Sequence, residues 1–176
     1  LKYVRDHNVK LKSFVSASGI GYYGTETTSH VFMESDSPSD EFVAEICVKW
    51  EAAAEQFKNT CRVVKLRTGV VLAAEGGALE KLSQPIKLGF GAPIGSGKQY
   101  MPCIHIEDLC RMYLFAIENE NINGVYNAVS GEKSTNKELT QAVARALHKP
   151  LWLPNVPGFV MKLAFGEMAN ILLGGS

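Results

Sequence analysis

The chain has 176 residues, of which 46% are apolar and 20% charged, a composition typical of a soluble globular protein. Lys and Arg total 18 and Asp and Glu total 18, so the net charge of zero argues against a nucleic-acid partner, which would favour a basic surface. No apolar run approaches the ~20 residues of a membrane span. The four cysteines lack Cys-x-x-Cys spacing, so we expect no metal site and reduced thiols in a cytoplasmic protein.

The first strand is expected at residues 12–18, "KSFVSAS", after a segment that reads as the tail of a helix. The strand runs into "SASGIGYYG" (16–24), which combines small residues with two adjacent tyrosines. Small residues at the end of a strand allow a planar ligand to approach the backbone closely. The stretch is therefore a candidate binding site.

A helix is expected over residues 39–59, with Ser39 or Asp40 as its N-cap. Its predicted buried face follows three-to-four spacing and consists of Phe42, Val43, Ile46, Cys47, Trp50, Ala53, Ala54 and Phe57. A second strand follows at 61–73, "CRVVKLRTGVVLA", with a glycine in its middle.

The remaining elements alternate in type. A glycine-rich loop is expected at 89–102, a helix at 106–119, a weaker strand at 124–130, and helices at 135–149 and about 158–172. Thr135 and Glu138 have the spacing of a capping box for the helix at 135–149. Alternating strands and helices predict βαβ units and a parallel sheet, so the fold class is α/β.

Several motifs resemble one family. "VSASGIGYYG", "WEAAAE", "VVKLRTGVVLAAEGGAL", "LGFGAPIGSGKQYMPCIHIEDL", "YNAVSGEKSTNKELT" and "FGEMANILLGG" occur in the order and spacing of the epimerase-family proteins. These proteins are an atypical branch of the extended short-chain dehydrogenase/reductases. The resemblance covers essentially the whole chain.

The resemblance implies the C-terminal part of a Rossmann-like, doubly wound parallel sheet with a smaller, mixed substrate-binding subdomain. We expect residues 1–88 to belong to the dinucleotide-binding domain and 89–176 mostly to the substrate-binding subdomain, with about 103–130 returning to the sheet. The family's glycine-rich N-terminal half is expected to lie outside this chain. The resemblance also implies NADP, or NAD, as cofactor and a small-molecule substrate, with a homodimer as an open alternative.

The catalytic residues are less clear than the fold. In the superfamily a Ser or Thr at a strand end holds the substrate, and a Tyr-x-x-x-Lys pair supplies the acid/base group; Ser18 matches the first of these. No tyrosine here is followed by Lys at the fourth position, and the matching helix positions carry Cys47 and Glu51. We therefore take Tyr22 or Tyr23 as the candidate acid/base group. The alternative is that one ring packs against the sheet while the other lines the cofactor.

The resemblance also assigns binding residues. The predicted cofactor-binding residues are Ser16, Arg67, Thr68, Gly69, Val70 and Val71, and the predicted substrate-binding residues are Gln99, Tyr100 and Met101. For Arg67, a salt bridge to a neighbouring helix is an equally weighted alternative.

Two functions remain open. The first is an NAD(P)-dependent oxidoreductase or epimerase that transfers a hydride to or from a small hydroxyl or carbonyl substrate, sugar nucleotides included. The second is a catalytically inactive dinucleotide-binding regulatory or scaffold protein, with a link to cell division; the missing Tyr–Lys pair favours it.

Overall fold

The computed structural model describes residues 1–166 and 173–175, and the chain divides into two compact units. The first unit comprises Leu1–Gly24, Val31–Thr68 and Glu107–Ala128. The second comprises Thr25–His30, Gly69–Ile106 and Val129–Ser176. The segment 107–128 thus belongs with the first strands of the chain, whereas the assignment of either unit to cofactor or substrate stays a prediction.

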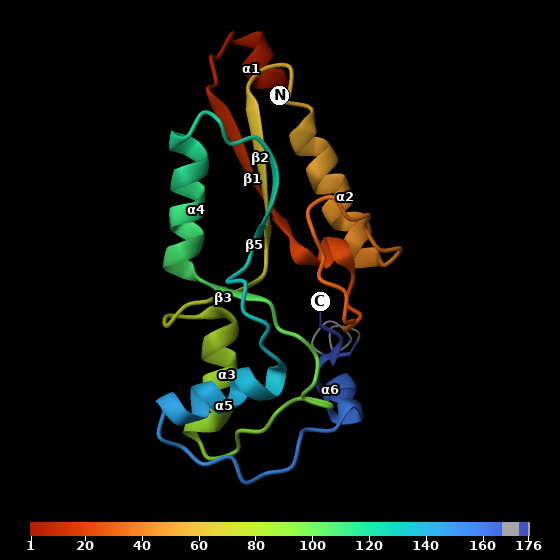
Figure 1. Cartoon of the computed structure of the whole chain (residues 1–176), viewed down its shortest axis with the longest axis vertical. Helices are drawn as coiled ribbons and strands as arrows, with labels where there is room; N and C mark the ends of the chain where they lie inside the picture. The colour runs from red at the N-terminus through yellow and green to blue at the C-terminus, as the bar shows by residue number, and fades with distance from the viewer. Residues whose placement is uncertain (167–172, 176) are drawn as a thin grey trace. The chain divides into compact units, whose positions relative to one another are not determined.

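The first unit is built on a three-stranded sheet in the order β1-β2-β5. The strands are β1 (Ser13–Gly19), β2 (Arg62–Thr68) and β5 (Gly124–Ala128), and both pairings are parallel. The register aligns Gly19 with Thr68 and Thr68 with Ala128, so the three strands end side by side (Figure 1). The predicted parallel sheet is confirmed.

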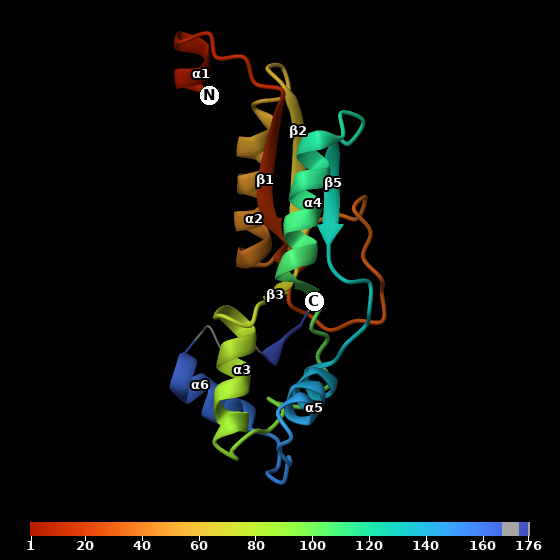
Figure 2. The same ribbon diagram turned by 90° about the vertical axis from the view of Figure 1, so that its left-hand side faces the viewer.

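Helices cover both faces of this sheet. Figure 2 shows α2 (Phe42–Glu55) on one face and α4 (Ile106–Glu118) on the other, which is the doubly wound arrangement. The short helix α1 (Lys2–Asp6) precedes β1, and the 3₁₀ helix η1 (Ile20–Tyr23) follows it. The expected α/β fold is therefore present.

The predicted buried face of α2 was right for Cys47 and Ala54 but wrong for Phe42 and Trp50. Phe42 and Trp50 are 74% and 58% exposed, and the buried residues are Ala44, Cys47, Glu51 and Ala54. The apolar spacing failed because α2 turns small residues and one carboxylate toward the sheet. The predicted N-cap was also wrong, because the helix begins after Glu41 without a side-chain cap.

Two glycines shape the turn between β1 and α2. A Cβ on Gly21 would lie 2.6 Å from Val43 Cγ1, so this position lets η1 approach α2. Gly24 has φ +93°, and its Cβ would lie 2.7 Å from both Ser39 Oγ and Glu41 Oε1. The packing of the turn thus explains two glycines of "SASGIGYYG".

The second unit contains a two-stranded parallel sheet of β3 (Val70–Leu72) and β4 (Cys103–His105). The predicted single strand over 61–73 was wrong, because the chain breaks at Gly69 between β2 and β3. A Cβ there would lie 2.5 Å from the carbonyl oxygen of Pro102, which also accepts a hydrogen bond from the Val70 amide. The break therefore depends on a distant segment.

Three helices complete the described part of the second unit: α3 (Gly77–Lys87), α5 (Asn136–Ala146) and α6 (Gly158–Phe165). The sequence analysis missed α3. It correctly predicted α5, whose capping box between Thr135 and Glu138 is present. Residues 89–102 form no helix or strand, as expected, and residues 167–172 of the predicted last helix lie outside the described residues.

Candidate functional site

Ser18 lies at the carboxyl end of β1 and faces α2. Its side chain is buried, and Oγ donates a hydrogen bond to Glu51 Oε1 at 2.8 Å. Alternation along the strand explains this orientation, because neighbouring side chains point to opposite faces of a sheet. Ser18 thus contacts the helix position that matches the superfamily's lysine.

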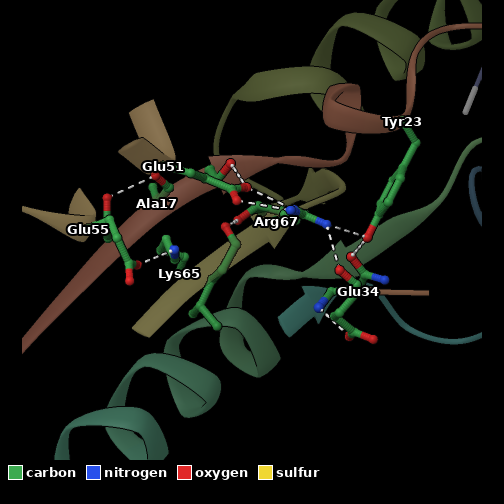
Figure 3. A network of polar contacts seen from close by, with 12 residues as sticks. Ala17, Tyr23, Glu34, Glu51, Glu55, Lys65 and Arg67 are labelled. Carbon is green, nitrogen blue, oxygen red and sulfur yellow. Dashed lines mark hydrogen bonds and ion pairs between the residues drawn. The ribbon is translucent and has the colours of Figure 1, made fainter. Parts of the chain in front are cut away.

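Glu51 forms a bidentate ion pair with Arg67 of β2. Arg67 Nε lies 2.8 Å from Oε1 and Nη2 lies 2.9 Å from Oε2, as Figure 3 shows. Burial raises the pKa of the Glu51 carboxyl, but hydrogen bonds from Arg67 and Ser18 and the charge of Arg67 outweigh burial and lower that pKa overall. Glu51 therefore stays ionised at neutral pH.

Both tyrosines of "GYYG" contact the Arg67 guanidinium. The Tyr22 ring lies face-on, 3.3 Å from Arg67 Cζ to the ring centroid. The Tyr23 hydroxyl accepts from Arg67 Nη1 at 2.8 Å and lies 2.8 Å from Asn127 Oδ1 of β5. Although burial lowers the pKa of Arg67, its partners Glu51 and Tyr23 raise it overall, so the guanidinium is a permanent cation.

Cys47 lies one helical turn before Glu51, at the position that matches the superfamily's tyrosine. The pKa of its thiol is raised overall, chiefly by burial and also by the charge of Glu51. A hydrogen bond with the Gly19 backbone, the charge of Arg67 and a hydrogen bond with Ser18 lower this pKa but do not outweigh burial. The sequence analysis expected a small core residue beside a carboxylate. A buried thiol with a raised pKa is a poor acid/base group at neutral pH.

The predicted cofactor residues fall in both units. Ser16, Arg67 and Thr68 lie on β1 and β2 of the first unit, and the Thr68 hydroxyl donates to the Leu66 carbonyl oxygen. Gly69, Val70 and Val71 belong to the second unit, where Val70 and Val71 pair with β4. For Arg67, the salt bridge to a neighbouring helix is present. A cofactor contact for any of these residues stays a prediction.

The second unit has an open cavity of about 440 Å³. Its described lining consists of Thr25, Glu26, Thr27, Ser96, Lys98, Gln99, Leu173 and Gly174. Most of these residues have polar side chains, and one of the three predicted substrate residues, Gln99, is among them. Tyr100 instead bridges to Thr135, and the Met101 amide donates to the Ser134 carbonyl oxygen. Their predicted contact with substrate stays untested.

Sequence reasoning missed three members of the polar cluster. It treated Glu51 only as a departure from the superfamily pattern, and it did not consider Glu34 or Asn127. The Asn127 amide donates to Glu34 Oε1 at 2.7 Å, although the two residues are 93 positions apart. The one signal in the sequence is spacing, because Glu51 lies four positions after Cys47 and three before Ala54, two members of the predicted buried face.

The chain has relatives among curated proteins, although no family model matches it. It is 38% identical over 165 residues to the mouse epimerase family protein SDR39U1, covering 93% of this chain and 56% of the relative. It is 41% identical over 167 residues to an epimerase family protein of Mycobacterium bovis, covering 92% and 54%. The chain is a relative of the epimerase family proteins. It spans about half the length of these curated relatives.

Solved structures agree with this relationship. The human epimerase family protein SDR39U1, crystallised with NADPH, is 36% identical with a TM-score of 0.88, covering 94% of this chain and 56% of that one. A nucleoside-diphosphate sugar epimerase of Corynebacterium glutamicum is 28% identical with a TM-score of 0.71, covering 94% and 38%. A Thermus thermophilus UDP-glucose 4-epimerase with NAD, 20% identical with a TM-score of 0.70 and covering 89% and 55%, shares the Rossmann-type fold.

Two structural features are absent from the described residues. None of their helices has the length and apolar character needed to cross a membrane. In the same part of the chain, no group of His, Cys, Asp or Glu side chains is arranged to hold a metal ion.

Proposed function

We propose that this chain forms the nicotinamide side of an NADP(H) site in an epimerase-family protein that acts by hydride transfer on a small hydroxyl or carbonyl substrate. The observation that carries the proposal is the similarity to the human relative crystallised with NADPH, at a TM-score of 0.88 over 94% of this chain. Sugar nucleotides are the candidate substrate class, because a relative at 28% identity is named a nucleoside-diphosphate sugar epimerase.

The residues at the strand ends fit a dinucleotide. β1 ends in the small residues Ser16 to Gly19, in parallel register with β2, and ligands of such sheets bind outside the carboxyl ends of the strands. Ser16, Thr68 and the backbone of Gly69–Val71 would hold the nicotinamide side of the cofactor. When bound, the cofactor supplies or accepts the hydride.

Ser18 would orient the substrate. Its hydroxyl proton is donated to Glu51, a carboxylate that only accepts, so the lone pairs of Oγ remain to accept from a substrate hydroxyl. Within the second unit, Gln99 and Lys98 line a cavity and are separate candidates for contact with a polar ligand.

Tyr23 is the better acid/base candidate of the two tyrosines, because a cation contacts its hydroxyl. Arg67 Nη1 lies 2.8 Å from that oxygen, whereas Arg67 lies over the ring face of Tyr22. The arrangement places a cation beside a phenol, as the superfamily's Tyr–Lys pair does. Tyr23→Phe should therefore reduce turnover by about a hundredfold, while Tyr22→Phe, which keeps the stacked ring, should leave it nearly unchanged. Unchanged turnover in both variants would remove the tyrosines from catalysis.

An inactive dinucleotide-binding protein is the second candidate. The position of the superfamily's lysine carries Glu51, and both carboxylate oxygens of Glu51 are already held by Arg67 and Ser18. A regulatory or scaffold protein needs the cofactor site but not the acid/base pair.

One experiment separates the two candidates. NADPH and NADH affinities are measured by nicotinamide fluorescence on the full-length protein, and turnover is measured by nicotinamide absorbance over a panel of carbonyl compounds and sugar nucleotides. Binding with turnover supports hydride transfer, and binding without turnover on any member supports the inactive alternative. No NADPH or NADH binding would contradict both.

A further inference from the structure

Arg67 connects α2 to a segment that crosses the end of the sheet. Two of its nitrogens bind Glu51, and the third, Nη1, donates to the Tyr23 hydroxyl at 2.8 Å and to the carbonyl oxygen of Glu34 at 3.3 Å. The Arg67 side chain is only 3% exposed. It is therefore committed to contacts inside the protein.

Residues 32–34, which we call the crossing segment, are anchored at the same place. The Phe32 ring stacks on Tyr23 with centroids 4.9 Å apart, and the Met33 carbonyl oxygen lies 3.1 Å from the Tyr23 hydroxyl. Glu34 Oε1 accepts from the backbone amide of Asn127 at 2.7 Å. Each of these contacts is made with Tyr23 or Asn127. Arg67 donates to the Tyr23 hydroxyl, which also lies beside the Asn127 side chain.

The crossing segment lies beside the carboxyl end of the sheet. Asn127 is the penultimate residue of β5, and β5 is the last strand in the order β1-β2-β5. The Glu34 carboxylate takes the amide of Asn127, which a further strand would otherwise bind. Met33 is 56% exposed. The segment thus forms a wall beside the carboxyl ends of the strands, which is where ligands of parallel sheets bind.

We propose that Arg67 is a positioning residue that holds the crossing segment as a fixed wall of the dinucleotide site, with Glu51 fixing the orientation of its guanidinium. The contact between wall and dinucleotide rests on the proposed function, but the anchoring by Arg67 does not. A planar guanidinium is needed, because only its fork can bind a carboxylate with two nitrogens, stack on Tyr22 and still donate to Tyr23.

Hydrogen exchange tests the anchoring. In Arg67→Lys the charge is kept but the fork is lost. The Met33 amide donates to Asp36 Oδ2, the Asp36 amide donates to the Met33 carbonyl oxygen, and the Asn127 amide donates to Glu34 Oε1. We expect roughly tenfold faster exchange at these three amides, of residues 33, 36 and 127. The amides of β1 and β2 should change by less than about twofold. The matched control is Glu55→Gln, which removes the neighbouring Glu55–Lys65 pair between the same helix and strand and should leave all these amides unchanged. Uniform acceleration across the first unit, or none, would overturn the proposal.

A double variant separates positioning from stability. Replacing a buried ion pair as a whole, in Glu51→Gln with Arg67→Met, avoids leaving one buried charge alone and should restore much of the unfolding free energy. The donors to Tyr23 and Glu34 are still missing, so exchange at residues 33, 36 and 127 should remain fast. Wild-type protection in the double variant would show that the ion pair acts only on stability and would overturn the proposal.

NADPH affinity tests the contact with the site. We expect Arg67→Lys to bind NADPH roughly tenfold more weakly, equivalent to about 1.4 kcal/mol, and Glu55→Gln to bind like the wild type. Faster exchange with unchanged affinity would refute the wall as part of the site. If the wild-type protein binds no NADPH, the proposed function fails, while the exchange measurements still decide the role of Arg67.

Discussion

The carboxylate of Glu51 and the guanidinium of Arg67 meet in two parallel contacts of 2.8 and 2.9 Å between α2 and β2. The same carboxylate holds the Ser18 hydroxyl, so one helix residue fixes the ends of two adjacent strands. The resemblance noted in the sequence predicts a lysine at this helix position. The carboxylate of Glu51 at this position has the opposite charge, and Arg67 of the neighbouring strand β2 neutralises it.

The first prediction concerns the energy of this pair. Glu51→Gln should lower the free energy of unfolding by about 3 kcal/mol, because it leaves the buried Arg67 cation without its counter-charge. Glu45→Gln is the matched control on the same helix, since the Glu45 and Lys49 side chains of that pair are 58% and 73% exposed and the pair is screened by solvent. The control should change the free energy of unfolding far less. Urea unfolding measures both, and equal losses would contradict a buried, uncompensated charge.

The second prediction concerns pH. Because the folded-state pKa of Glu51 is lowered, the pair contributes its full stability above the ordinary carboxyl pKa of about 4.3 and loses it as pH falls through the lower, folded value. The difference in unfolding free energy between the wild type and Glu51→Gln should therefore be constant from neutral pH down to about pH 5. It should shrink at more acidic pH. A difference that grew on acidification would have the wrong sign for an ionised Glu51.

The third prediction concerns Gly24. Gly24→Ala combines an unfavourable φ of +93° with a Cβ 2.7 Å from Ser39 Oγ, and we expect a loss of about 2–3 kcal/mol. Gly131→Ala is the control, because Gly131 has φ +76° but nothing within 4 Å of its added Cβ. Backbone strain alone should cost roughly 1 kcal/mol there. Equal losses in thermal or urea unfolding would show that the packing of the turn adds nothing.

Local patterns predicted the parts of the fold that local interactions determine. The helix α5 and its capping box follow from residues three positions apart, and β1 follows from a short apolar run with small residues at its end. The break at Gly69 was not predictable in this way, because it depends on the carbonyl oxygen of Pro102, 33 positions along the chain.

The candidate site was predicted only in part for the same reason. Ser18, Tyr22, Tyr23 and Arg67 were singled out, but as separate candidates for contact with substrate or cofactor. Ser18 and Arg67 both bind Glu51, and the two tyrosines contact Arg67. Apolar periodicity placed Glu51 outside the buried face. A buried carboxylate is stable only with a partner, and the partner of Glu51 is Arg67, which lies on the strand β2 and not on the same helix. The pattern of one helix therefore could not reveal it.

The central claim is that the strand ends of this chain bind the nicotinamide side of NADP(H). Hydrogen exchange with and without NADPH tests it most directly. The account predicts that the cofactor slows exchange at the amides of residues 16–19 and 68–71, while the amides of α5, far along the chain, stay the same. Binding of NADPH that leaves both strand-end stretches unprotected would contradict it.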